Sequence, residues 1–183
     1  MTDTIEFGKR INHRPIIVSL LVSFFFGGLG LIVNIKVAII SFLLVLFLLV
    51  CVYFPLNLPL LFGHWQLENH GISYYKMNSY RDKIKMILFP NQTDFQFISY
   101  SQIKNFQVIE EEKQYSVNDI LTINPAKQSF LPWLRKPFFL ELEMNHAETN
   151  LDLSFDQFHD PKNTLFRLSN VLTILAHKVE LRN

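Results

Sequence analysis

The residues of this chain that could bind a metal ion or act as a nucleophile are scattered along it. Six histidines are present, but none belongs to a His-Glu-x-x-His pair or stands at ligand spacing from a cysteine. The single cysteine, Cys51, lies inside an apolar run, so it has no partner for an internal disulfide and no setting for thiol catalysis. We therefore predict a chain with no metal site and no cofactor.

Carboxylate pairs are the other residues whose spacing could serve catalysis. Glu141 and Glu143 stand two residues apart, but they alternate with apolar residues, so strand alternation explains their spacing. The run Glu110–Glu112 reads as a solvated loop, because adjacent carboxylates do not converge on a cation. The sequence has no phosphate-cradling glycine loop and no Gly-x-Ser-x-Gly nucleophile elbow. We predict no catalytic residue and no enzyme activity.

Arg81, Lys83 and Lys85 form the first of two groups that could contact a membrane or a partner. They alternate with other residues, so a strand would display all three on one face. Cations near a surface of anionic lipid headgroups contribute about 1 kcal/mol each. A plain solvated strand face is the alternative interpretation.

The second group follows Phe130, where Trp133 and Leu134 stand directly before Arg135 and Lys136. Amphipathic belts at membrane interfaces combine aromatic, apolar and basic residues in this way. The alternative is that these aromatic residues fill the core from a long loop. The group predicts a low-affinity contact with lipid or a partner.

Two apolar segments must position these groups. Residues 16–33 and 37–54 each comprise 18 residues without a charge, a length of about 27 Å as helix against a bilayer core of about 30 Å. We predict a transmembrane hairpin over residues 16–54, preceded by a tail (1–15) and followed by an interfacial connector (55–63) in which Pro55 and Pro59 end the second helix. Gly27, Gly28 and Gly30 suit ordinary hairpin packing.

The flanking charges predict the orientation of the hairpin. Lys9, Arg10 and Arg14 precede the first segment, the turn holds only Lys36, and further cations follow the second segment. The positive-inside rule then places both termini in the cytoplasm of a multi-pass protein of the cell membrane. A cleaved signal peptide is the rival interpretation, but no small-x-small cleavage site follows and a second apolar segment begins at once.

Residues 64–183 show alternating apolar residues typical of antiparallel strands. A hairpin is predicted over residues 65–74, with further strands at 83–89, 95–99, 104–109 and 119–123, and a second hairpin pairing 138–144 with 151–155. Asp160 and Pro161 begin a final helix. Its apolar stripe, which must cover a face of the sheet, consists of Leu165, Leu168, Leu172, Leu175 and Val179.

This order resembles the pleckstrin-homology-like superfold, and residues 65–74, 98–103, 138–155 and 165–179 carry the resemblance. It implies an α+β, mainly β domain, with a curved antiparallel sheet of about seven strands capped by a C-terminal amphipathic helix. The two-helix anchor before it resembles the EbsA-like small membrane proteins of Gram-positive bacteria. Neither resemblance implies a catalytic residue, and a fold alone does not establish a function.

Residues 64–183 carry 13 Lys or Arg against 14 Asp or Glu, so the domain lacks the basic field that nucleic-acid binding needs. We expect a non-enzymatic, membrane-anchored interaction or scaffold domain. It would bind a protein partner, a second copy of itself or anionic lipid headgroups. The alternatives are self-protection against membrane-active peptides and a pore-forming or transport role. Without ionisable residues inside the apolar segments, a pore is the less favoured of these.

Overall fold

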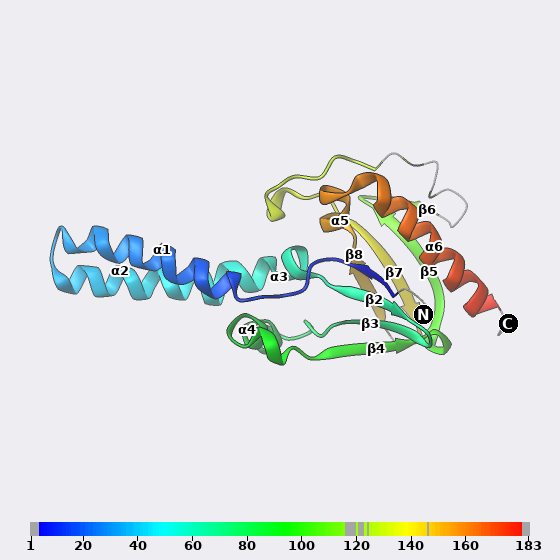
Figure 1. Cartoon of the computed structure of the whole chain (residues 1–183), viewed down its shortest axis with the longest axis horizontal. Coiled ribbons are helices and arrows are strands. Elements are labelled where there is room, and N and C mark those ends of the chain that lie inside the picture. The colour runs from blue at the N-terminus through cyan, green and yellow to red at the C-terminus, as the bar shows by residue number, and fades with distance from the viewer. Residues whose placement is uncertain (1–3, 116–119, 121–122, 124, 146, 181–183) are drawn as a thin grey trace. The chain divides into compact units, whose positions relative to one another are not determined.

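The computed structural model describes residues 4–115, 120, 123, 125–145 and 147–180 (Figure 1). Its chain divides into two compact units. The helical unit comprises Ile11–Pro59 and Lys76–Asp94, and the sheet unit comprises Met1–Arg10, Leu60–Tyr75 and Phe95–Asn183. The sheet unit therefore contains the N-terminal segment as well as most of the C-terminal two thirds of the sequence.

The helical unit is built on two long apolar helices that lie side by side (Figure 1). The first is α1 (Arg14–Leu31). The second begins with α2 (Ile35–Phe47), continues through the π-helical turn η1 (Leu48–Tyr53) and ends with α3 (Phe54–Phe62). By length and composition alone, Arg14–Leu31 and Ile35–Phe62 could each cross a membrane. Between them, the side chain of Asn34 caps α2 by accepting a 3.0 Å hydrogen bond from the Val37 N–H.

Small residues form the contact face of α1. Ser19, Ser23, Gly27 and Gly30 are buried, and the two serine hydroxyls donate to the carbonyls of Pro15 and Ser19 within α1. A Cβ atom at Gly30 would lie 2.7 Å from the Cα of Ala38, which is too close for any larger residue. Gly27 and Gly30 therefore pack within the hairpin as predicted, whereas a Cβ atom at Gly28 would meet nothing within 4 Å. Ser19, Ser23 and Gly27 follow one another at a spacing of four.

The sequence predicts that Pro55 and Pro59 end the second apolar helix, and this prediction is wrong, because α3 continues to Phe62. Pro55 has no N–H to donate to the carbonyl of Cys51 four residues earlier. The hydroxyl of Tyr80 donates to that carbonyl instead. A donor from elsewhere in the helical unit thus replaces the missing backbone donor and lets the helix run on.

Residues 83–89 do not form the predicted strand; they belong largely to α4 (Tyr80–Leu88). Ser79 and Asp82 form a reciprocal capping box at its first turn, a strong local start signal. Met86 and Ile87 are buried as neighbours, which a strand with one buried face would not allow. A short 3-10 turn, η2 (Pro90–Gln92), follows.

The sheet unit contains two antiparallel sheets of four strands each among the described residues. The first has the order β1 (Ile5–Phe7), β2 (Trp65–Glu68), β3 (Gly71–Tyr75), β4 (Phe95–Ser99). The hairpin predicted over residues 65–74 is confirmed, with Glu68 opposite Gly71 across a two-residue turn. β1 lies in a segment predicted to be a tail, and it pairs antiparallel with β2.

The second sheet follows the 3-10 turn η3 (Tyr100–Gln102) and has the order β6 (Lys113–Tyr115), β5 (Ile103–Glu110), β7 (Phe138–Met144), β8 (Glu148–Asp152). The strand predicted over 119–123 lies mostly outside the described residues. The partner of β7 was expected over 151–155, and this range is wrong. Asp152 accepts hydrogen bonds from Ser154 and from the Phe155 N–H, which turns the chain into α5 (Ser154–His159).

The predicted closing helix is confirmed as α6 (Pro161–Glu180). Asp160 accepts a 3.3 Å hydrogen bond from the Asn163 N–H, as expected of an N-cap. Leu168, Leu172 and Leu175 are fully buried in one core with residues of both sheets. An N-terminal helical part, two antiparallel sheets and a C-terminal helix therefore agree with the predicted α+β class, with eight described strands in two sheets.

β1 is fixed to the sheet unit by contacts from the C-terminal part of the chain. The ring of Phe7 stacks on Trp65 with centroids 4.4 Å apart. Gly8 then turns the chain with φ of +72°, and a Cβ atom there would lie 2.3 Å from the carbonyl oxygen of Gly63. The Gly8 N–H donates to Asp156 in α5 at 2.5 Å. Arg167 in α6 joins this cluster, donating to Asp156 and to the carbonyl of Glu6.

Candidate functional site

The basic residues predicted to lie along a strand belong instead to α4. Arg81 and Lys85, four positions apart, lie on one exposed helical face. Lys83 is only half-exposed and falls on another side of the helix. The Nζ atom of Lys85 lies 2.8 Å from the carboxylate of Asp94, which lowers the pKa of that carboxyl. The structure thus brings two of the three cations together, and Asp94 partly neutralises this pair.

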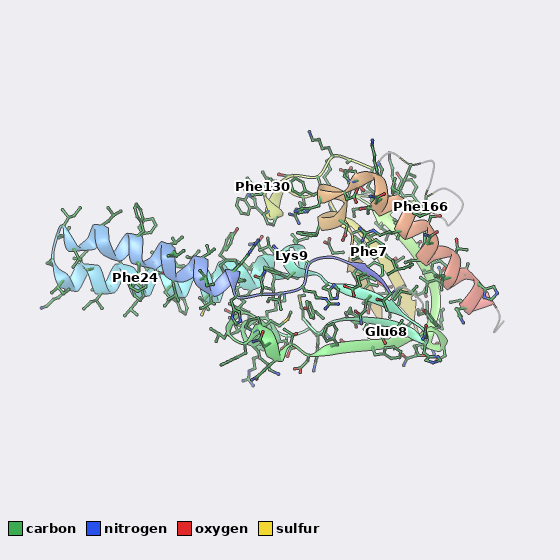
Figure 2. The ribbon with its side chains drawn as sticks, viewed as in Figure 1. Phe7, Lys9, Phe24, Glu68, Phe130 and Phe166 are labelled. Atoms are coloured by element: carbon green, nitrogen blue, oxygen red, sulfur yellow. The ribbon has the colours of Figure 1, made fainter. Side chains whose placement is uncertain are left out.

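The loop that holds Trp133 exposes its apolar side chains. Trp133 is 54% exposed, Leu134 59% and Phe130 75%, and Figure 2 shows Phe130 at the surface of the sheet unit. The 3-10 turn η4 (Pro132–Leu134) gives the loop its local shape. The alternative in which these residues fill the core is therefore wrong for Trp133 and Leu134.

Arg135 holds this loop in place. Its Nε donates to the carbonyl of Ser129 at 3.1 Å, and its Nη1 donates to the carbonyl of Leu60 at 2.6 Å. Its guanidinium also lies 5.6 Å from the ring centroids of Phe155 and Phe158. Burial lowers the pKa of Arg135, although it stays charged in the usual pH range. The guanidinium is therefore directed into the sheet unit.

Lys136 is paired as well. Its Nζ lies 2.6 Å from the carboxylate of Glu111 in the turn between β5 and β6. This hydrogen bond raises the pKa of Lys136. The two cations predicted to meet lipid headgroups beside Trp133 thus have partners within the sheet unit.

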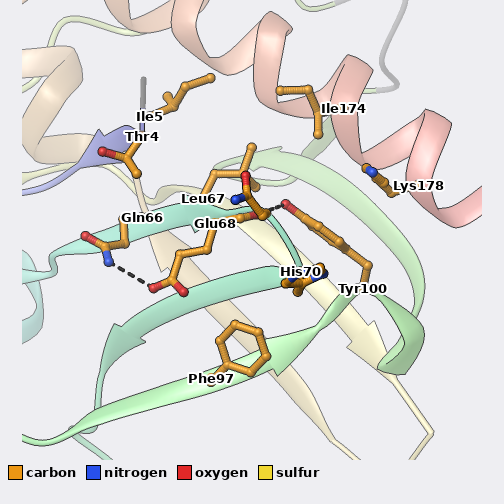
Figure 3. Close-up of a pocket in the computed structure, with 11 residues that line it drawn as sticks. Thr4, Ile5, Gln66, Leu67, Glu68, His70, Phe97, Tyr100, Ile174 and Lys178 are labelled. Carbon is orange, nitrogen blue, oxygen red and sulfur yellow. Dashed lines mark hydrogen bonds between the residues drawn. The ribbon is translucent and has the colours of Figure 1, made fainter. Parts of the chain in front are cut away.

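A solvent-open groove of about 610 Å³ lies at the β2–β3 turn of the sheet unit (Figure 3). β1 and β2 line it together with Phe97 of β4, Tyr100 of η3, and Ile174 and Lys178 of α6. These segments are far apart in the sequence, so no local pattern indicates the groove. Its lining contains both apolar and polar side chains, as is common where a protein binds another chain or a small molecule.

Hydrogen bonds fix the polar wall of this groove. The carboxylate of Glu68 accepts from the side-chain amide of Gln66 at 2.9 Å (Figure 3). Hydrogen bonds from Ser73 and Gln66 lower the pKa of Glu68, so its carboxylate is ionised at neutral pH. The Tyr100 hydroxyl donates to the backbone carbonyl of Glu68 at 2.6 Å, and burial raises the pKa of Tyr100 to about 12. The groove therefore presents the Glu68 carboxylate beside an aromatic ring, and its lining also contains Lys178.

No family model, no curated protein and no solved structure matches this chain.

The titratable residues do not form a metal site in the part of the chain that the structure describes, where no three His, Cys, Asp or Glu side chains come together. His64 is the most deeply buried histidine among these residues. Its Nδ1 donates to the carbonyl of Phe7 at 3.0 Å, and its Nε2 lies 3.9 Å from the Glu6 carboxylate. Burial lowers the pKa of His64, so the ring is neutral at pH 7 and joins β1 to the start of β2.

Proposed function

We propose that this chain is a non-enzymatic, membrane-anchored interaction module, in which the apolar hairpin crosses the membrane and the sheet unit binds a protein partner. The observation that carries the proposal is the pairing of β1 with β2. One strand precedes the two apolar helices and the other follows them. In the sequence, the hairpin therefore lies between two strands that are neighbours in the folded sheet.

This pairing argues against a cleaved signal sequence. Cleavage after α1 would remove Phe7 from its stack on Trp65 and the Gly8 N–H from Asp156. A removable leader does not supply a strand and core residues to the mature fold. The contacts of β1 therefore support a hairpin that stays in the protein.

The exposed surface of the hairpin argues against a soluble helical core. Leu21, Phe24 and Phe25 of α1 are all more than half exposed, and Figure 2 labels Phe24 on the hairpin. A soluble monomer rarely exposes a continuous apolar surface of this size. In a bilayer the same side chains would face lipid, so their exposure supports two membrane spans.

The same pairing supports a topology with both flanks of the hairpin on one side of the membrane. Neighbouring strands of one sheet occupy one compartment, and α1 and α2 form an even number of crossings. The positive-inside rule then favours the cytoplasm, since Arg10 and Arg14 flank the hairpin and only Lys36 lies in its turn.

We further propose that the sheet unit is a variant of the pleckstrin-homology-like superfold in an EbsA-like membrane protein. Two antiparallel sheets and the C-terminal helix α6 support this assignment. The sheet unit differs from the expected fold of about seven strands in having β1, which precedes the membrane segment in the sequence. With β1, the described strands number eight. The groove is the proposed partner site. The groove holds the acidic Glu68 and the basic Lys178 beside apolar side chains, a mixture that suits a protein segment better than an anionic headgroup.

The topology is tested with single cysteines in a Cys51→Ser background. We expect Lys36→Cys to react with a membrane-impermeant thiol reagent on intact cells, and Ser101→Cys to react only after the cells are opened. Labelling of Ser101→Cys alone on intact cells would contradict the orientation. Release of the protein by alkaline carbonate would contradict membrane anchoring itself.

The partner site is tested with a photo-crosslinking amino acid at position 97 of the full-length protein in cells. Phe97 lines the groove and Phe166 is an exposed phenylalanine of α6 outside it, so position 166 is a matched control. We expect a discrete protein adduct from position 97 and none from position 166. Absence of an adduct at position 97, or the same adduct at both positions, would remove the groove as the partner site.

A further inference from the structure

We propose that the loop Phe130–Leu134 inserts into the interface of the bilayer, and that this insertion does not require anionic lipid. The inference rests on the proposed membrane anchoring and adds a third membrane contact, one made by the sheet unit. Its occupant is the lipid bilayer. The loop differs from the two long helices, because it belongs to the sheet unit and is separated from them in the sequence by several strands.

The side chains of the loop are suited to an interface. Four of its five residues are large and apolar, and all four are exposed: Phe130, Leu131, Trp133 and Leu134. Tryptophan at a lipid–water boundary places its ring among the acyl chains and its N–H near the headgroups. Exposed in water, the same cluster would form an apolar patch without a function.

The position of the loop is fixed by Arg135. Its Nη1 donates at 2.6 Å to the carbonyl of Leu60, the residue at which the chain enters the sheet unit. Leu60 also lies in the last turn of the apolar helix that runs from Ile35 to Phe62. The exposed loop and the end of a proposed membrane span are therefore held together within the sheet unit.

The length of the helix Ile35–Phe62 indicates how far its last turn would extend across a bilayer. It has 28 residues, which extend about 42 Å at about 1.5 Å per residue. The hydrocarbon core is about 30 Å thick, and the bilayer with its headgroups is about 40 to 45 Å thick. If this helix spans the hydrocarbon core, its last turn reaches the headgroup region, and the Leu60 carbonyl to which Arg135 donates belongs to that turn.

Contacts made by Arg135 and Phe130 with the rest of the sheet unit hold the loop in place. Arg135 donates to the carbonyls of both Ser129 and Leu60, and its guanidinium lies against Phe155 and Phe158. The ring of Phe130 in turn lies 6.1 Å from that of Phe158. Arg135 is therefore a positioning residue, which presents the apolar side chains without itself reaching the lipid.

The partners of the two cations explain why anionic lipid is not required. The charge of Arg135 is directed to carbonyl groups and aromatic rings inside the sheet unit, and Lys136 is paired with Glu111 at 2.6 Å. The two charges are thus at least partly balanced within the sheet unit. Burial of apolar surface is then the main source of the binding free energy, and this term is insensitive to headgroup charge.

The test uses the full-length protein in phosphatidylcholine vesicles whose acyl chains carry bromine, a quencher of tryptophan fluorescence. The chain has two tryptophans. Trp65 is buried against Phe7 and donates to the Asp152 carbonyl, so it should be shielded from the bromine. We expect brominated lipid to quench part of the emission, and Trp133→Phe to abolish that quenched part. The melting temperature of Trp133→Phe should match that of the parent protein.

Two further arms make the result decisive. Adding phosphatidylglycerol to the vesicles should leave the quenched fraction unchanged, whereas quenching seen only with this anionic lipid would overturn charge independence. Arg135→Gln should reduce the quenched fraction and Arg135→Lys should restore part of it. Equal quenching in the parent protein and Trp133→Phe would overturn the insertion. Labelling of Lys36→Cys in the same vesicles reports hairpin insertion separately, so failure of the loop and failure of the anchor are distinguishable.

Discussion

The carboxylate of Asp156 accepts a hydrogen bond from the backbone N–H of Gly8, and 148 positions of sequence separate the two residues. Its other oxygen accepts from Arg167 at 2.8 Å, and Arg167 also donates to the carbonyl of Glu6 at 2.9 Å. One short strand before the apolar hairpin is thus held by two helices at the far end of the chain. The stability of the sheet unit should depend on this cluster.

Asp156→Ala should lower the free energy of unfolding by about 2 to 4 kcal/mol, because it leaves the Gly8 N–H and the half-buried Arg167 guanidinium without their acceptor. Thermal unfolding of the detergent-solubilised protein, followed by near-ultraviolet circular dichroism, measures the loss. Arg10→Ala is the control, since Arg10 makes an exposed ion pair with Glu6 worth about 0 to 1 kcal/mol. Equal effects of the two changes would contradict the role of Asp156.

Gly30→Val should destabilise the helical hairpin by about 1 to 3 kcal/mol, because its side chain would overlap the backbone of Ala38. Gly28→Val is the matched control, since a Cβ atom at Gly28 meets nothing within 4 Å. Loss of helicity when SDS is titrated into the mild-detergent solution measures hairpin stability. The same midpoint for Gly28→Val and Gly30→Val would argue against packing at Gly30.

Asp152 should give the sheet unit a distinctive pH dependence. Burial raises the pKa of Asp152 from its ordinary value to about 6. The folded state then binds the proton more tightly than the unfolded state. The contribution of this group to stability is fully present at a pH below the ordinary pKa and is lost as the pH rises through about 6.

Asp152→Asn should remove that contribution while its side-chain oxygen still accepts from the Ser154 N–H. Relative to the variant, the parent protein should lose up to about 3 kcal/mol of stability between about pH 4 and pH 7. Melting curves of both proteins across this range measure the difference. The other carboxyl groups contribute the same pH dependence to both proteins, so the comparison isolates the contribution of Asp152. If the parent protein instead became more stable than Asp152→Asn as the pH rises over this range, the predicted role of Asp152 would be contradicted.

Leu172→Asp should prevent stable folding of the sheet unit, because a carboxylate would be buried without a partner in the core beneath α6. Phe166→Asp, on the exposed side of the same helix, should change the melting temperature little. Circular dichroism of the two purified variants compares them. An unchanged melting temperature for Leu172→Asp would remove α6 as the helix that covers the core.

The elements that were predicted correctly each carry their own periodic signal. The β2–β3 hairpin, β7 and α6 alternate or repeat over enough residues for the buried face to be read from the sequence. β1 has three residues, and its partner β2 begins 60 positions further on. No local pattern can show a pairing over that distance.

Two of the three errors originate in contacts between distant residues, which no local pattern shows, whereas the error over α4 does not. The alternation of Arg81, Lys83 and Lys85 predicts a strand where α4 forms, although the Ser79–Asp82 capping box is visible in the sequence. The helix continues past Pro55 because the Tyr80 hydroxyl donates a hydrogen bond to the Cys51 carbonyl. Arg135 and Lys136 were expected at a membrane surface, and only the folded chain shows their bonds to Leu60 and Glu111.

The position of β1 also sets an order of events during synthesis. Gly8 leaves the ribosome long before Asp156, and 148 positions correspond to about 7 to 30 s at a translation rate of about 5 to 20 residues per second. During that interval α1, α2 and then β2 are synthesised, while Asp156 and Arg167, which hold β1 in the folded protein, have not yet been made. If β1 docks only when α5 and α6 are present, the outer edge of β2 stays unpaired until then, and an unpaired edge is a site of aggregation. A chaperone or a nascent-chain contact that covers β2 would therefore act on this protein late, after its hairpin has been made and before α5 and α6 have formed.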